Sequence, residues 1–101
     1  RSIITKEYFD TTTYIFEDNQ ISEVSLVKPN GKKIVTVKFD MPILAIWSKE
    51  RADAPFVCLE PWHGRCDRME FEGDLADREC NIVLEPGKKF NNVYSIEILA
   101  G

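Results

Sequence analysis

The segment Glu60-Pro61-Trp62-His63 combines the residue types in this sequence best suited to acid–base chemistry. An apolar run, 56–59, precedes Glu60, so its carboxylate is expected to be partly withdrawn from water, as suits a general base. Pro61 favours an extended backbone at Glu60 and thereby directs its side chain. Judged by burial statistics alone, such a carboxylate more often faces solvent. The pattern makes Glu60 a candidate base and leaves that alternative open.

Two tryptophans and the single histidine are candidates for ligand binding. The indoles of Trp62 and Trp47 could stack on the apolar face of a ligand ring, although large aromatic residues more often serve core packing. His63 is expected in a loop near the mouth of a pocket, and an acid–base role is chemically possible for its imidazole.

A charged cluster follows directly. Arg65, Asp67 and Arg68 could bind the hydroxyl groups of a sugar, or the phosphate of a sugar phosphate, because an Arg guanidinium presents a fork of donors. Such a cluster is more often a solvated loop.

A metal site is the rival interpretation, since Cys58, His63, Cys66 and Cys80 include the side chains that bind zinc. Structural zinc sites usually place paired ligands two to four residues apart, and only His63 and Cys66 satisfy this spacing. We therefore expect no metal, and the acid–base chemistry requires no cofactor.

Composition excludes several classes of partner. Thirteen Lys and Arg residues face seventeen Asp and Glu residues, and no basic run is present, so nucleic acid is not an expected partner. Apolar stretches are too short to span a membrane. Three cysteines cannot all pair, and the first residues lack the order of a secretory signal, which favours reduced thiols in the cytoplasm. The length suits one domain, residues 1–101, and the start at Arg1 is compatible with a fragment.

Short β-branched and aromatic runs separated by turn residues predict an all-β chain. In 22–28 and 33–39 we expect a hairpin, because Asn30-Gly31 supplies the positive φ angles of a tight turn. Within the second arm, Val35, Val37 and Phe39 alternate with polar or smaller residues, as in a half-buried strand.

Other strands are expected at 11–17, 43–48, 56–60 and 90–99. The second and third of these lack alternation, which predicts positions in the middle of a sheet. Residues 61–77 form a long loop with at most one short helical turn, and long loops in compact domains are often functional.

Three segments together resemble the C-terminal part of aldose 1-epimerases, in particular the LacX-like branch. They are Met41-Pro42-Ile43-Leu44-Ala45-Ile46-Trp47-Ser48, then Ala54-Pro55-Phe56-Val57-Cys58-Leu59-Glu60-Pro61-Trp62-His63-Gly64, then Leu84-Glu85-Pro86-Gly87-Lys88-Lys89-Phe90. Cys-Leu-Glu-Pro-Trp is the most specific motif. The resemblance implies an antiparallel β-sandwich that forms the C-terminal part of a larger galactose mutarotase-like supersandwich.

The resemblance also implies a reaction, the interconversion of the α and β anomers of an aldose, with Glu60 at the position of the family's base. The family's acid is a His from an earlier segment, and His63 does not match that position. We therefore expect the chain alone to be inactive, or nearly so. A non-catalytic carbohydrate-binding module is the alternative.

The expected partners follow from both arguments. A monosaccharide or sugar phosphate is the expected ligand. Uncovered sheet edges and apolar faces predict self-association, or association with an upstream segment of the same protein.

Overall fold

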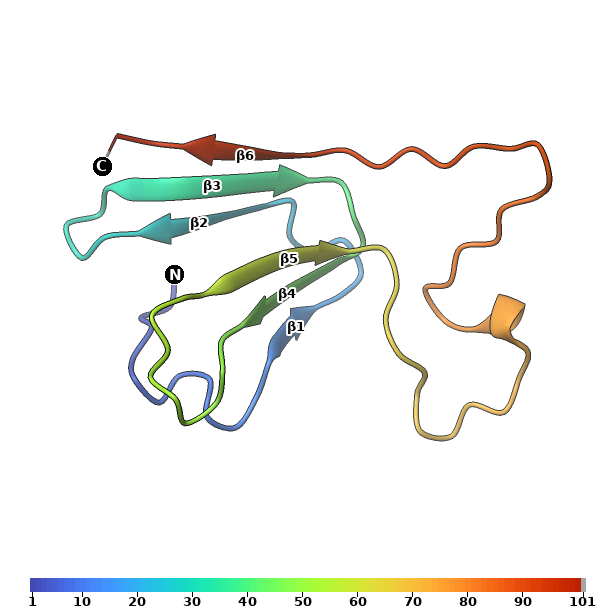
Figure 1. Ribbon diagram of the computed structural model, residues 1–101, viewed down its shortest axis with the longest axis horizontal. Coiled ribbons are helices and arrows are strands. Elements are labelled where there is room, and N and C mark those ends of the chain that lie inside the picture. Colours follow the sequence, from blue (N-terminus) through green and yellow to red (C-terminus); the bar gives the residue numbers. More distant parts are fainter. Residues whose placement is uncertain (101) are drawn as a thin grey trace.

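A computed structural model describes residues 1–100 and is almost entirely β-structure, as predicted. Two three-stranded antiparallel sheets form a sandwich-like arrangement (Figure 1). Sheet A has the strand order β1-β4-β5 and sheet B the order β2-β3-β6. The elements are β1 (Tyr14–Phe16), β2 (Glu23–Val27), β3 (Lys33–Phe39), β4 (Ile43–Trp47), β5 (Cys58–Trp62), the 3₁₀ helix η1 (Leu75–Asp77) and β6 (Tyr94–Ile98).

The hydrophobic core lies where the two sheets meet. Val37 and Phe39 from β3 pack with Leu44 from β4 and with Met41 from the connection between these strands. Partly buried apolar side chains from the neighbouring segments complete the cluster: Phe16, Ile21, Val24, Ile46 and Leu59. Sheet packing therefore depends on one face of each sheet, which is the arrangement expected of a sandwich.

The predicted hairpin is confirmed as β2 and β3, which pair in antiparallel register. Gly31 has a φ of +88°, whereas Asn30 has no positive φ, so the expectation that both residues supply one is wrong for Asn30. Its side chain acts instead, because Asn30 Oδ1 accepts a hydrogen bond from the Lys32 N–H at 3.0 Å. The turn thus spans more than two residues and requires only one left-handed position.

Central positions in a sheet were predicted for the strands at 43–48 and 56–60, and the prediction is confirmed for the first of them. β4 lies between β1 and β5, as its apolar sequence predicts, but within residues 1–100 β5 is an edge strand rather than a central one. β5 also begins later than predicted and continues through Pro61 to Trp62. Because proline has no N–H to donate, an edge position suits a strand that contains it.

The remaining segments are less regular than predicted. β1 has three residues, and the terminal strand forms only over β6, since within the described residues no strand pairs with 90–93. The predicted loop contains the expected short helical turn, η1. No helix within residues 1–100 is long and apolar enough to cross a lipid bilayer.

The molecule is extended for its size. Its radius of gyration is 16.4 Å, compared with about 13 Å for a compact domain of 100 residues. Figure 1 shows why: the segment after η1 runs away from both sheets before it returns as β6. Much apolar surface therefore remains outside the core.

Leu44 should be the most sensitive leucine in the chain, because its side chain is almost fully buried between the sheets. We expect Leu44→Ala to lower the free energy of unfolding by about 2–5 kcal/mol through lost burial and the cavity left behind. Leu75→Ala, in the exposed helix η1, is the matched control and should cost less than about 0.5 kcal/mol. Urea denaturation followed by circular dichroism measures both, and equal costs would contradict this description of the core.

Candidate functional site

Strand register places three of the predicted site residues on one face of sheet A. Glu60 lies opposite Ala45, and Trp47 lies opposite Cys58. Trp62 follows Glu60 by two residues on β5, and successive side chains of a strand alternate between faces. Trp47, Glu60 and Trp62 therefore share the outer face of sheet A, opposite to the face of Leu44 and Leu59. This face is covered in part, because Ile43 and Ala45, the strand partners of Trp62 and Glu60, are fully buried.

Glu60 and Trp62 contact each other directly. The Trp62 Nε1–H donates a hydrogen bond to Glu60 Oε1 at 3.3 Å, and both residues are half-buried. The bond engages Oε1, and within residues 1–100 Glu60 takes part in no ion pair that would occupy its other oxygen, Oε2. This arrangement leaves the carboxylate able to accept a proton at Oε2.

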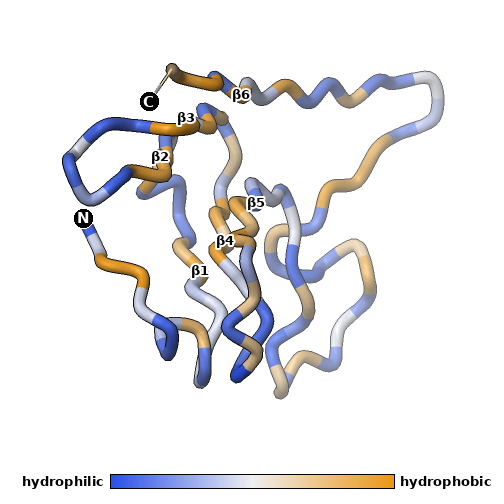
Figure 2. Tube along the Cα trace, turned by 60° about the vertical axis from the view of Figure 1, so that its left-hand side comes forward, coloured by the Kyte–Doolittle hydropathy of each residue, from blue (hydrophilic) through white to orange (hydrophobic). Residues whose placement is uncertain are grey.

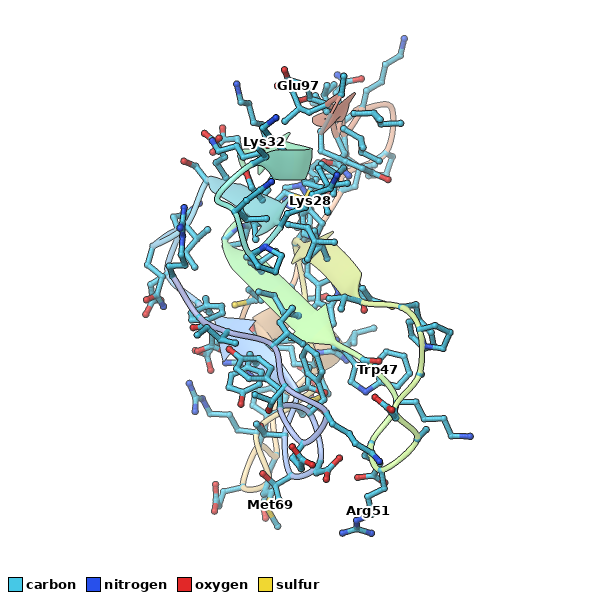
Figure 3. All side chains as sticks on the ribbon, turned by 90° about the vertical axis from the view of Figure 1, so that its left-hand side faces the viewer. Lys28, Lys32, Trp47, Arg51, Met69 and Glu97 are labelled. Atoms are coloured by element: carbon cyan, nitrogen blue, oxygen red, sulfur yellow. The ribbon has the colours of Figure 1, made fainter. Side chains whose placement is uncertain are left out.

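Trp47 occupies the rim of the same face. It is the last residue of β4, and its exposed indole lies at the surface of sheet A (Figure 3). Its ring contacts Phe56 in a tilted arrangement, with ring centroids 5.9 Å apart. The indole is therefore partly held by packing and partly open to a ligand.

His63 connects the end of β5 to the C-terminal segment. Its Nε2 forms a hydrogen bond with Asn92 Oδ1 at 3.2 Å, and its ring meets Phe90 edge to face with centroids 4.9 Å apart. Neither partner was anticipated, because both lie almost thirty residues away in a segment expected to be a regular strand. These contacts direct His63 towards the C-terminal segment.

Arg65 is held by carboxylates on two separate segments. Its side chain is only 10% exposed, and it forms ion pairs with Glu17, next to β1, and with Glu79, near the end of the long loop. Arg68 also binds Glu79, through two hydrogen bonds. These contacts tie the loop after β5 to sheet A.

Asp67 is engaged in the same network. It forms an ion pair with Arg78 at 2.8 Å, and Arg78 also donates a hydrogen bond to the carbonyl oxygen of Arg65 at 3.0 Å. The three arginines are thus matched by three carboxylates. Arg65 and Asp67, predicted as sugar-binding residues, have intramolecular partners and hold the loop together.

The pairing residues Glu17, Arg78 and Glu79 were not recognised from the sequence. They belong to separate charged stretches, and no regular spacing relates them to Arg65. The one signal in the sequence that could have suggested ion pairs is the density of charge in the loop.

Within this network, Glu79 is the residue whose pKa is shifted most. Hydrogen bonds from Arg68 and then Arg65 lower the pKa of its carboxyl to about 2. The same contacts with Glu79 raise the pKa of Arg65 and of Arg68 above the usual range for arginine. Glu79, Arg65 and Arg68 are therefore all charged near neutral pH.

The cysteine and histidine side chains do not gather into a metal centre. Throughout residues 1–100, no three Cys, His, Asp or Glu side chains come close enough together to hold an ion. Cys58, Cys66 and Cys80 are all free thiols. The zinc interpretation gains no geometric support.

Two shallow hollows lie elsewhere on the surface. One, of about 180 Å³, lies between the N-terminal segment and the residues that follow β4, and includes Ser48 and Phe56 in its lining. The other, of about 250 Å³, is lined by the loop residues Arg68, Phe71 and Arg78 among others. Neither is lined by Glu60, whose site is a sheet face rather than a closed pocket.

Comparison with known proteins adds no relative. No protein-family model matches this chain, and neither a curated protein nor a solved structure shows significant similarity to it. Evidence on function therefore comes from the motifs and from the geometry of the site.

Glu79 should make the loop after β5 sensitive to acid. Because its pKa is lowered by folding, its contribution to stability is fully present above the unfolded value of about 4.3. That contribution is lost as the pH falls towards about 2. We expect Glu79→Gln to reproduce this loss at neutral pH, with tryptic cleavage at Arg68 and Arg78 several-fold faster than in the wild type.

Glu72→Gln is the matched control, because Glu72 is an exposed residue of the same loop and takes part in no ion pair within residues 1–100. Mass spectrometry of the tryptic digest measures the cleavage rates. If Glu79→Gln were cleaved as slowly as Glu72→Gln, the ion pairs would not be what holds the loop.

Proposed function

We propose that this chain carries the general base of a site that interconverts the α and β anomers of an aldose. The single observation that carries the proposal is the Glu60–Trp62 pair on the outer face of sheet A, with Trp47 on the same face. A carboxylate oriented by an indole N–H, beside aromatic surface, suits a ligand that has both hydroxyl groups and an apolar ring face.

The chemistry requires only proton transfers. Glu60 Oε2 removes the proton of the hydroxyl on C1, the C1–ring oxygen bond breaks, and an acid protonates the ring oxygen to give the open-chain aldehyde. Rotation about the C1–C2 bond followed by the reverse steps closes the ring on the other face of the carbonyl. No cofactor is needed, because no electron pair leaves the sugar.

The acid in this scheme has to come from outside the Glu60–Trp62 pair. His63 does not occupy the position of the family's acid, and its contacts with Asn92 and Phe90 direct it towards the C-terminal segment. The chain alone is therefore expected to be inactive or nearly so. The two sheets would then form part of a larger galactose mutarotase-like sandwich that supplies the acid.

The charged loop bears on the choice of ligand. Arg65 and Arg68 are both matched by carboxylates, so binding a phosphate would require breaking ion pairs that are already formed. A neutral aldose is for this reason favoured over a sugar phosphate. The three free thiols agree with a reducing compartment, and we propose the cytoplasm.

A non-catalytic carbohydrate-binding module is the second candidate. The same tryptophans and Glu60 can hold a sugar without turning it over, and the absence of a matched acid favours this alternative. The two candidates differ in one measurable property, which is whether Glu60 transfers a proton.

Chemical rescue separates the candidates, because imidazolium from the buffer can replace the missing acid. We expect the wild-type chain to accelerate the mutarotation of freshly dissolved α-D-glucose or α-D-galactose in proportion to imidazole concentration, as measured by polarimetry at constant ionic strength. Glu60→Gln should lower this protein-dependent rate by about 10²-fold or more, since the base is lost. Glu72→Gln, an exposed carboxylate of the long loop, is the matched control and should retain the rate.

Sugar binding by Glu60→Gln, followed by nuclear magnetic resonance titration, completes the test. Retained binding with a lost rate identifies Glu60 as the base. A Glu60→Gln chain that keeps the rescued rate would refute the proposal, and binding by both chains without any rescued rate would establish the non-catalytic module instead.

A further inference from the structure

β6 leaves one edge and one apolar face of sheet B uncovered. Within the described residues it is the last strand of the sheet, and all five of its residues are exposed. Figure 2 shows apolar residues on β6 as well as on β2 and β3 of the same sheet. An exposed, hydrophobic edge strand is a template for pairing with another strand.

The apolar residues of β6 extend the face of sheet B that forms the core. Tyr94 lies opposite Phe39, Ile96 opposite Val37, and Ile98 opposite Val35. Opposite residues in a ladder share a face, so these three side chains lie on the same face of sheet B as the core residues Val37 and Phe39. Yet Tyr94, Ile96 and Ile98 remain 52%, 59% and 84% exposed.

We infer that β6 pairs in antiparallel fashion with β6 of a second copy of this chain, about a two-fold axis that passes through Ile96. The two copies of sheet B then form one continuous six-stranded sheet. New backbone hydrogen bonds and the cross-strand contacts among Tyr94, Ile96 and Ile98 of the two copies supply the driving force.

Backbone hydrogen bonding is compatible with this register. The Leu99 N–H donates to the Ile34 carbonyl oxygen, so the odd-numbered residues of β6 bond to β3. By the alternation of an antiparallel ladder, the N–H and C=O groups of Tyr94, Ile96 and Ile98 point to the open edge. A two-fold axis at Ile96 pairs Ile96 with itself and Tyr94 with Ile98 of the other copy, which satisfies every one of these groups.

Side-chain charges favour the same register. Ser95 of one copy lies opposite Glu97 of the other, and Ser95 is also opposite Lys38 in its own sheet. Each Lys38 is therefore in a row with Glu97 of the second copy, separated by one small side chain and by two strand spacings of about 4.8 Å. A long lysine side chain can cross this distance over a serine.

Lys38 is available for such a contact. It is exposed and takes part in no ion pair within residues 1–100, while Glu23, its neighbour on β2, is paired with Lys33. An axis at Glu97 instead would place two carboxylates opposite each other, which is destabilising. Charge complementarity and the backbone ladder therefore agree on the axis at Ile96.

Two charge reversals test the register in a way that contacts within one copy cannot imitate. The dimer contains two such rows, each with residue 38 of one copy and residue 97 of the other. In a Lys38→Glu dimer both rows contain two carboxylates, and in a Glu97→Lys dimer both rows contain two lysines. In a mixed dimer of the two variants, both rows bring opposite charges together. We expect the wild-type chain to dimerise at tens of micromolar by sedimentation velocity, each variant alone to dimerise about tenfold more weakly or worse, and the mixture to recover.

Ile96→Lys should abolish dimerisation because it places two charges at the axis. Met69→Lys is the matched control, since Met69 is 99% exposed in the long loop, at the opposite end of the molecule from Glu97 (Figure 3). Circular dichroism establishes that each variant is folded. Amide hydrogen exchange on the wild-type chain provides a readout without any substitution, since Ile96 should become more protected as dimer forms.

A wild-type chain that remains monomeric at these concentrations would overturn the inference. The free edge of β6 would then pair with a different segment or protein. Dimerisation that survives Ile96→Lys, or a mixture that associates no better than the separate charge variants, would overturn the inference too.

Discussion

The packing of Leu44 against Val37 and Phe39 is the contact on which the rest of the structure depends, because it joins the two sheets. Once Leu44 faces sheet B, the pleat of β4 and its pairing with β5 determine every other side-chain direction in sheet A. A shift of one residue in this pairing would turn Glu60 into the core, where an unpaired carboxylate is very costly. The same contact that builds the core therefore directs Glu60, Trp62 and Trp47 outward.

The limited extent of the cluster around Leu44 also explains two other features of the surface. This cluster includes no residue of β6, so the apolar face of sheet B continues into solvent at Tyr94, Ile96 and Ile98. The loop after β5 has few apolar side chains to bury and is tied down by ion pairs instead, with Arg65 between Glu17 and Glu79. Hydrophobic burial organises the sheets, and charge organises the loop.

Much of the fold could be predicted because its signals are local. The alternation of Val35, Val37 and Phe39 and the turn glycine Gly31 predicted the hairpin, since both patterns act over a few residues. The position of β5 at a sheet edge could not be predicted from its apolar run, because pairing depends on distant strands. For the site, the motif singled out Glu60 and Trp62, but the hydrogen bond between them and the partners of Arg65 and His63 depend on tertiary packing that no spacing reveals.

We propose that the outer face of sheet A, at Glu60, receives an aldose. The most direct test is a titration of the ¹⁵N-labelled chain with the sugar, followed by nuclear magnetic resonance. We expect the largest shifts at the Trp62 indole N–H and at the amides around Glu60, with smaller shifts at Trp47. Shifts confined to the charged loop or to the hollow beside Phe56, with Trp62 unchanged, would contradict this proposal.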